Sequence, residues 1–227
     1  MRYFAICLLL GILLTSCATV HSLSQGGFRP AVAPAMPFTP PLVEIGVISE
    51  GNKPQFDGEA TAASVALLRR RLLAHQAELR LSGELAVPDS LRPAAGRELA
   101  QAVESLHKRT RLTGGANLPV LDYLLQQQGQ RYVLVPVAQG FTRRPGNYAG
   151  QIAKDIAVGV LSMGTMVPMT VKANSHISLF VYDSQQHAIV YLTRTHPRDG
   201  REPLNEASVE KQLRQILRRD YPFVPRP

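Results

Sequence analysis

The chain has 227 residues, a formal net charge of +8 and two cysteines, Cys7 and Cys17. This length suits one domain of ordinary size with a hydrophobic core of its own. A basic chain first suggests nucleic acid as a partner. The N-terminal segment predicts export, however, so we expect no nucleic acid and instead anionic lipid head groups, wall polymers or an acidic protein face.

Residues 1–16 have the organisation of a secretory signal peptide. Arg2 supplies a positive start, and residues 3–14 form an uncharged apolar run. Such a run is too short to cross a bilayer as a helix, which takes about 20 apolar residues. A charged start, a short apolar core and small residues before the cleavage point are typical of a signal peptide. The run closes with Leu-Thr-Ser-Cys at residues 14–17.

This tetrapeptide resembles the bacterial lipobox, a Leu followed by two small residues and a Cys. The resemblance implies that the Cys17 thiol carries diacylglycerol, that the signal is cut before Cys17, and that the new amino terminus is acylated, for example with palmitate. Two or more acyl chains anchor a protein stably. In enteric-type sorting an Asp after the Cys retains the protein in the inner membrane. Ala18 therefore favours the outer membrane, with the domain in the periplasm.

The composition then divides the chain into segments. Residues 17–41 read as a proline-rich tether, which at about 3.1 Å per residue would reach roughly 70 Å. Residues 42–221 form the expected domain, with an apolar insert at 146–171, and 222–227 form a proline-rich tail. Without the signal, whose one charge is Arg2, the net charge is +7. With Cys7 removed and Cys17 acylated, no disulfide is expected.

Periodicity predicts the elements of the first half of the domain. Residues 42–48 are rich in β-branched side chains and predict a buried strand. Apolar residues at helical spacing predict helices over 59–81 and 94–108. A third helix is expected up to Gln128, with Asn117 as its N-cap and Pro119 in its first turn.

The second half predicts strands and one helix. Residues 131–138 read as a strand in which Pro136 indicates an edge position or a bulge, because proline donates no ladder hydrogen bond. Residues 176–182 and 187–193 alternate as strands around a tight connection and predict a β-hairpin. A last helix is expected over 206–219, capped by Asn205.

These elements predict an α/β (α+β) domain with a mixed sheet of about four strands and helices packed on it, in the order β-α-α-α-β-(insert)-β-β-α. The segment 128–135, Gln-Gly-Gln-Arg-Tyr-Val-Leu-Val, and Asp183 at the hairpin turn resemble a group of envelope domains. The group comprises the periplasmic part of the curli-secretion channel lipoprotein, the lipoprotein activators of penicillin-binding proteins and the N-terminal domain of the Tol-system propeller protein. The resemblance implies an adaptor or assembly role and supplies no catalytic residues.

The insert at 146–171 is the most unusual stretch, because it carries no charge from Ile156 through Val171. Three alternatives are open. It forms a transmembrane β-hairpin of an oligomeric pore, it forms an interfacial or partner-binding helix, or it covers the domain's own sheet. In the second case the membrane or partner contacts are Ile156, Val160, Met163 and Met166, since methionine offers an adaptable apolar surface.

No motif for catalysis or metal binding is found in the sequence. Ser162 lacks the preceding glycine of a nucleophile elbow, and the histidines form no short ligand cluster. We expect no catalytic residue, metal or cofactor. Arg143 and Arg144, between two glycines, are candidates for an anion or lipid head-group contact.

The sequence therefore predicts a lipid-anchored protein of the cell envelope that is not an enzyme. Its expected role is that of a binding or accessory subunit in envelope assembly, transport or maintenance. It would contact the membrane through lipidated Cys17 and another envelope protein through its domain. The alternative is an oligomeric secretion or pore-forming subunit that inserts residues 156–171 in the outer membrane. The oligomeric state stays open.

Overall fold

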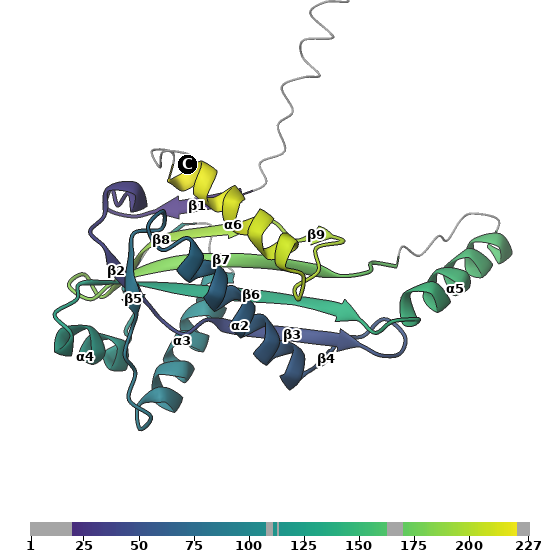
Figure 1. Cartoon of the computed structure of the whole chain (residues 1–227), viewed down its shortest axis with the longest axis horizontal. Coiled ribbons are helices and arrows are strands. Elements are labelled where there is room, and N and C mark those ends of the chain that lie inside the picture. The colour runs from purple at the N-terminus through teal and green to yellow at the C-terminus, as the bar shows by residue number, and fades with distance from the viewer. Residues whose placement is uncertain (1–19, 108–110, 113, 163–169, 222–227) are drawn as a thin grey trace, which may run out of the picture.

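The computed structural model describes residues 20–107, 111–112, 114–162 and 170–221. Helices pack on a mixed sheet, which makes the chain an α/β protein as the sequence predicted. The sheet is larger than predicted, with nine strands instead of about four. The elements and their arrangement are drawn in Figure 1.

The strands are β1 (Val20–Ser24), β2 (Met36–Phe38), β3 (Leu42–Ile48), β4 (Gln55–Phe56), β5 (Leu81–Glu84), β6 (Tyr132–Arg143), β7 (Asn174–Asp183), β8 (Ala188–Thr195) and β9 (Arg198–Asp199). The helices are η1 (Pro30–Val32), a 3-10 turn, and α2 (Gly58–Ala74), α3 (Arg92–His107), α4 (Pro119–Gln127), α5 (Asn147–Leu161) and α6 (Glu206–Asp220). The predicted strand at 42–48 and the predicted hairpin are confirmed by β3, β7 and β8. The predicted helix over 59–81 ends at Ala74, and its last residues begin β5.

The long strand β6 organises the sheet. Its one side pairs antiparallel with β7, which continues through β8 to β1. Its other side pairs parallel first with β2 and then with β3. The sheet is mixed because β6 has antiparallel strands on one side and parallel strands on the other. The parallel strands β2 and β3 are connected to β6 through helices, as parallel pairing requires.

Helices cover both faces of the sheet. α2 and α6 cross in front of it in Figure 1 and bury one core with Leu134, Leu179 and Val181. α3 and α4 pack on the other face with Val135, Phe180 and Tyr182 of the same strands. This alternation follows from the two-residue period of a strand. It confirms the predicted division of β7 into two faces and makes both faces apolar.

The proline-rich tether predicted at 17–41 is wrong for residues 20–41, which belong to the fold. β1 pairs with β8 along its whole length, and β2 lies between β5 and β6. Val20 is 3% exposed and Phe38 is fully buried. The low charge of this stretch reflects burial in the core. Its prolines fall where a donor is not needed, for example Pro30 at the start of η1.

Pro136 does not lie at an edge of the sheet, which corrects the prediction. β2 ends at Phe38 opposite Leu134, and β3 begins at Leu42 opposite Val137. Pro136 therefore occupies the point where β6 changes partners. No residue of β2 or β3 is paired with it in the described chain, so the missing N–H costs little on that side.

Helix caps were predicted with mixed success. The Asn205 side chain accepts a hydrogen bond from the Ser208 N–H at 3.0 Å, which confirms it as the N-cap of α6. The N-cap of α4 is Leu118 rather than Asn117. The first N–H groups of α4 have no partner within the helix. The Glu98 carboxylate of α3 accepts a hydrogen bond from one of them, the Val120 N–H, at 2.9 Å.

Candidate functional site

The predicted anchor lies directly before the first described strand. Cys17 itself is outside the described residues, as are Met163 and Met166. Val20, three positions after Cys17, is paired with Thr195 in the sheet. Three residues span at most about 11 Å when fully extended. The domain therefore begins almost at the predicted lipid attachment point.

A cluster of basic side chains surrounds this point. His21 faces Arg194 across the β1–β8 ladder, and the Arg219 side chain donates a hydrogen bond to the carbonyl oxygen of Val20. Burial lowers the pKa of the His21 imidazole, and the positive charges of Arg194, His196 and Arg219 lower it further. These four residues, His21, Arg194, His196 and Arg219, are called the basic cluster below.

α5 follows the far end of β6. Val20 lies opposite Thr195 of β8, and the next pairs along the row join Arg194 to Ser178 of β7 and Ser178 to Val137 of β6. The chain therefore enters β1 level with the middle of β6. Figure 1 shows α5 projecting beyond the end of β6, well past the start of β1.

Arg143 holds the base of α5 in place. Its guanidinium donates to the carbonyl oxygens of Val171 at 2.7 Å and Gly51 at 2.9 Å. It also donates to the side-chain oxygens of Asn147 and Asn52, both at 2.6 Å. The structure gives Arg143 this bracing role, and the predicted anion or lipid head-group contact of Arg143 and Arg144 stays a prediction. Arg144 is exposed in the adjoining turn.

α5 presents apolar side chains away from the domain. Figure 1 shows the helix projecting beyond the end of the sheet. Ile156 is 62% exposed and Val160 is 73% exposed. The alternative in which this segment covers its own sheet is therefore wrong. The β-hairpin alternative is wrong for Asn147–Leu161, because these residues are helical.

The polar side of α5 is the packed one. Asp155 is 8% exposed, and its carboxylate accepts a hydrogen bond from the Thr170 hydroxyl on the returning chain. A helix packed on its own domain normally buries its apolar side. α5 has the reverse arrangement.

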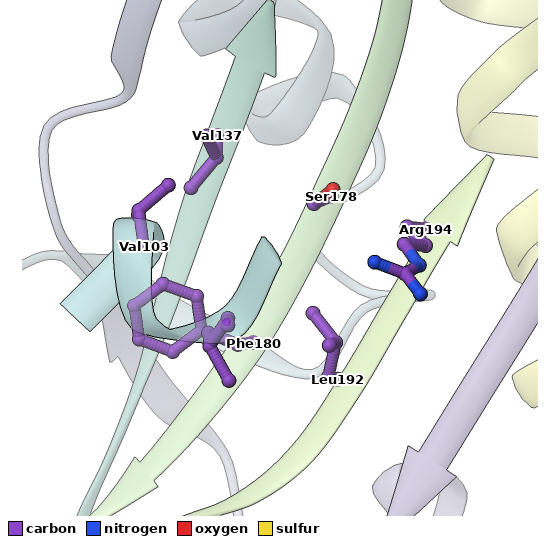
Figure 2. Close-up of a pocket in the computed structure, with 7 residues that line it drawn as sticks. Val103, Val137, Ser178, Phe180, Leu192 and Arg194 are labelled. Carbon is purple, nitrogen blue, oxygen red and sulfur yellow. The ribbon is translucent and has the colours of Figure 1, made fainter. Parts of the chain in front are cut away.

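A small hollow lies on the α3 side of the sheet (Figure 2), lined by Val103, Leu106, Val137, Ser178, Phe180, Leu192 and Arg194. Its cavity volume is only about 20 Å³, which is room for about one water molecule and far below the volume of a ligand pocket. A second, more open hollow of about 360 Å³ adjoins it and shares Val103 and Val137. We call the two together the α3 groove. Arg194 lines the first hollow and also belongs to the basic cluster.

Other clusters of ionisable side chains form ion pairs and hydrogen bonds within the protein. Asp183 is fully buried, and its carboxylate forms a bidentate ion pair with the Arg131 guanidinium at 2.7–3.1 Å. His75 contacts Glu78 and Glu210 at 3.0–3.1 Å and ties α2 to α6. No cluster of three or more His, Cys, Asp or Glu suited to a metal occurs among the described residues.

Within the described parts of the chain, none of the helices has both the length and the apolar character needed to traverse a bilayer. Sequence reasoning found α5 as an unusual segment but missed the basic cluster. His21, Arg194 and Arg219 are far apart in the chain, and only the pairing of β1 with β8 brings them together.

Comparison with known proteins gives a distant structural likeness. No family model and no curated protein sequence matches the chain. Among solved structures, it is similar to PelC dodecamers from Paraburkholderia phytofirmans in two crystal forms, one of them a point variant. In both cases the identity is 14% and the TM-score 0.37, with 88% of this chain covered and 99% or 96% of the other. The resemblance of residues 128–135 to other envelope domains stays a prediction.

Proposed function

We propose that this chain is a lipoprotein of the cell envelope that is anchored through Cys17 and acts as a binding or accessory subunit. In this proposal the domain faces the periplasm from the outer membrane and serves envelope assembly, transport or maintenance. The observation that carries the proposal is the position of Val20. A lipobox-like Cys three residues before a strand that is paired in the sheet leaves no room for a long linker.

The short connection changes what the anchor does. A lipid on Cys17 would hold the sheet end with Val20 within about 11 Å of its attachment point. The basic cluster would then lie close to the bilayer surface. Each basic residue near an anionic membrane contributes about 1 kcal/mol, with the effect fading within a Debye length. Arg194 and Arg219 supply the positive charge of the cluster, which an anionic membrane attracts, and Asp220, 3.8 Å from the Arg219 guanidinium, offsets part of it.

The α3 groove supports a binding role. Its lining is mainly apolar, and Arg194 and Ser178 supply polar groups. An apolar hollow with a few polar groups is the usual form of a recognition site. We propose that the partner is another protein of the envelope, which would bind close to the membrane because Arg194, which lines the groove, lies opposite His21 near the proposed anchor.

Crosslinking in cells tests the partner. A photoreactive residue at Glu44, which is exposed beside the groove, is compared with one at Lys211 on the exposed side of α6. We expect a defined envelope protein to be captured from position 44 and not from position 211. Identical products from both positions would contradict a partner site in the groove.

A second candidate function is an oligomeric secretion or pore-forming subunit that inserts residues 156–171 in the outer membrane. Because Asn147–Leu161 are helical, residues 156–161 would enter the membrane as part of α5 and not as a strand of a β-hairpin. The exposed apolar side chains of Ile156 and Val160 favour this candidate. Purified lipidated protein would be examined for ring oligomers and for leakage of dye from liposomes. Rings with leakage would favour this candidate, whereas monomers without leakage would eliminate it.

A further inference from the structure

The exposed side of α5 forms a continuous apolar stripe. Ala149, Ala153, Ile156 and Val160 recur at intervals of three or four residues and are all exposed. This spacing places them on one side of a helix. Ala157 borders the stripe and is also exposed. Lys154 and the Asp155–Thr170 contact lie away from it, so the apolar side is left without a partner in the described chain.

We propose that this α5 stripe lies in the interfacial region of the same membrane that holds Cys17. The proposal rests on the proposed lipid anchor and adds a second, non-covalent contact to it. The occupant of the stripe is a lipid surface.

The proposed anchor supports a membrane as the occupant. β1 begins level with the middle of β6, and α5 projects beyond the end of that strand on the same domain. An anchor at Cys17, three residues before Val20, keeps this domain and its exposed helix at a bilayer surface. Since the anchor fixes the domain near the surface, even a weak interfacial affinity suffices, because the second contact is then intramolecular.

Length and charge favour lying on the membrane. The 15 residues of α5 measure about 22 Å, which is less than the roughly 30 Å of the hydrocarbon core. The uncharged stretch from Ile156 to Val171 follows Lys154 and Asp155 and precedes Lys172. Lys154 lies in the middle of α5, and a long lysine side chain there can extend its ammonium group to lipid head groups.

Size disfavours a second copy of the chain as the occupant. One side of a helix of this length offers on the order of 200–300 Å². A stable protein interface buries about 800 Å² on each partner. Two large side chains, Ile156 and Val160, and several alanines are too small a surface for a stable dimer, but they are enough to rest in a lipid interface.

Fluorescence quenching tests the inference in the full lipidated protein. A new cysteine is the only free thiol of the mature chain if Cys17 is acylated, so Ile156→Cys and Val160→Cys can each carry an environment-sensitive dye. Val158→Cys, on the opposite side of the same helix, and Lys211→Cys on α6 are the controls. Vesicles contain phosphatidylethanolamine and phosphatidylglycerol, with nitroxide-labelled lipid as quencher.

We expect dyes at positions 156 and 160 to lose about half of their emission when the nitroxide sits just below the head groups, with a blue shift. Dyes at 158 and 211 should be affected far less. Equal quenching at all four positions, or none at 156 and 160, would overturn the proposal. Disulfide-linked dimers of Val160→Cys without quenching would also overturn it, in favour of a second copy.

The anchor has its own readout in the same experiment. Flotation of the vesicles reports whether the protein is bound at all. Protein that floats but shows no quenching refutes the α5 contact and leaves the lipid anchor intact. Protein that stays behind, while Cys17 is found unmodified by mass spectrometry, refutes the proposed function itself.

Discussion

Val20 is paired with Thr195 in the first step of the β1–β8 ladder. This pair joins the segment after the predicted lipid site to the end of the hairpin, 175 positions later in the numbering. Because of this pairing, a segment that the sequence predicts as a linker is an edge strand of the sheet. If Cys17 carries the proposed lipid, the distance between domain and membrane depends on three residues instead of about 25, the length of the predicted tether.

The first prediction concerns β1 as part of the fold. Val20→Ala should lower the free energy of unfolding by about 1–2 kcal/mol, because Val20 is buried and its methyl groups would be lost from the core. Val32→Ala is the matched control, since Val32 is 72% exposed. Urea denaturation of both variants measures the difference. Equal stability of Val20→Ala and wild type would mean that residues 20–24 are a linker after all.

The second prediction concerns the brace at the base of α5. Arg143→Ala removes the hydrogen bonds to Gly51, Asn52, Asn147 and Val171. Hydrogen exchange of the amides in α5 should become faster, while exchange in the central strands should stay unchanged.

Arg144→Ala is the control for this brace, because Arg144 is exposed in the neighbouring turn. It should leave exchange in α5 as in the wild type. If the two variants behave alike, Arg143 does not hold the helix.

The third prediction concerns stability in acid. Burial alone would raise the pKa of Asp183, but the Arg131 side chain and the N–H groups of Gln185 and Gln186 hold this pKa below its ordinary value. The unfolded carboxyl, with a pKa of about 3.9, then binds protons more readily than the folded one. The resulting stabilisation is present above about pH 4 and is lost as the pH falls through the folded pKa.

Asp183→Asn should therefore cost about 2–4 kcal/mol at pH 7, and its deficit against the wild type should shrink below about pH 4. Asp89→Asn is a suitable control, because the Asp89–Arg92 pair is exposed and should contribute little. Denaturation curves at several pH values give both quantities. A deficit that stays constant down to pH 2 would argue against the ionised pair.

The fourth prediction concerns the close approach of β6 and β7. A Cβ atom at Gly140 would lie 2.9 Å from the Cα of Ser175 and would also meet the carbonyl oxygen of Asn174. Gly140→Ala should cost about 1–3 kcal/mol. Gly150→Ala, in α5, has open space and should be neutral or slightly stabilising. Thermal unfolding of both variants measures this difference in stability. If Gly140→Ala is as stable as the wild type, the strands can separate at this point.

Much of the fold could be predicted from local sequence patterns. β3 and the β7–β8 hairpin were predicted because β-branched runs and alternation are properties of short segments. The cap of α6 was predicted because Asn205 acts on its own next turn. The α/β class followed from the order of these elements.

The remainder depends on pairing between distant residues. β1 is a short stretch, Val-His-Ser-Leu-Ser, and only its partner β8 makes it a strand. Pro136 is tolerated because β6 changes partners beside it, which no local pattern reveals. The apolar character of α5 was visible in the sequence, but its projection from the sheet is a property of the tertiary structure.

We propose that a lipid on Cys17 holds this domain at a membrane. Mass spectrometry of the N-terminal peptide from membrane-extracted protein tests this anchor. We expect a mature chain that begins at Cys17 and carries diacylglycerol and an N-linked acyl chain. A chain that begins at another residue, or an unmodified thiol at Cys17, would contradict it.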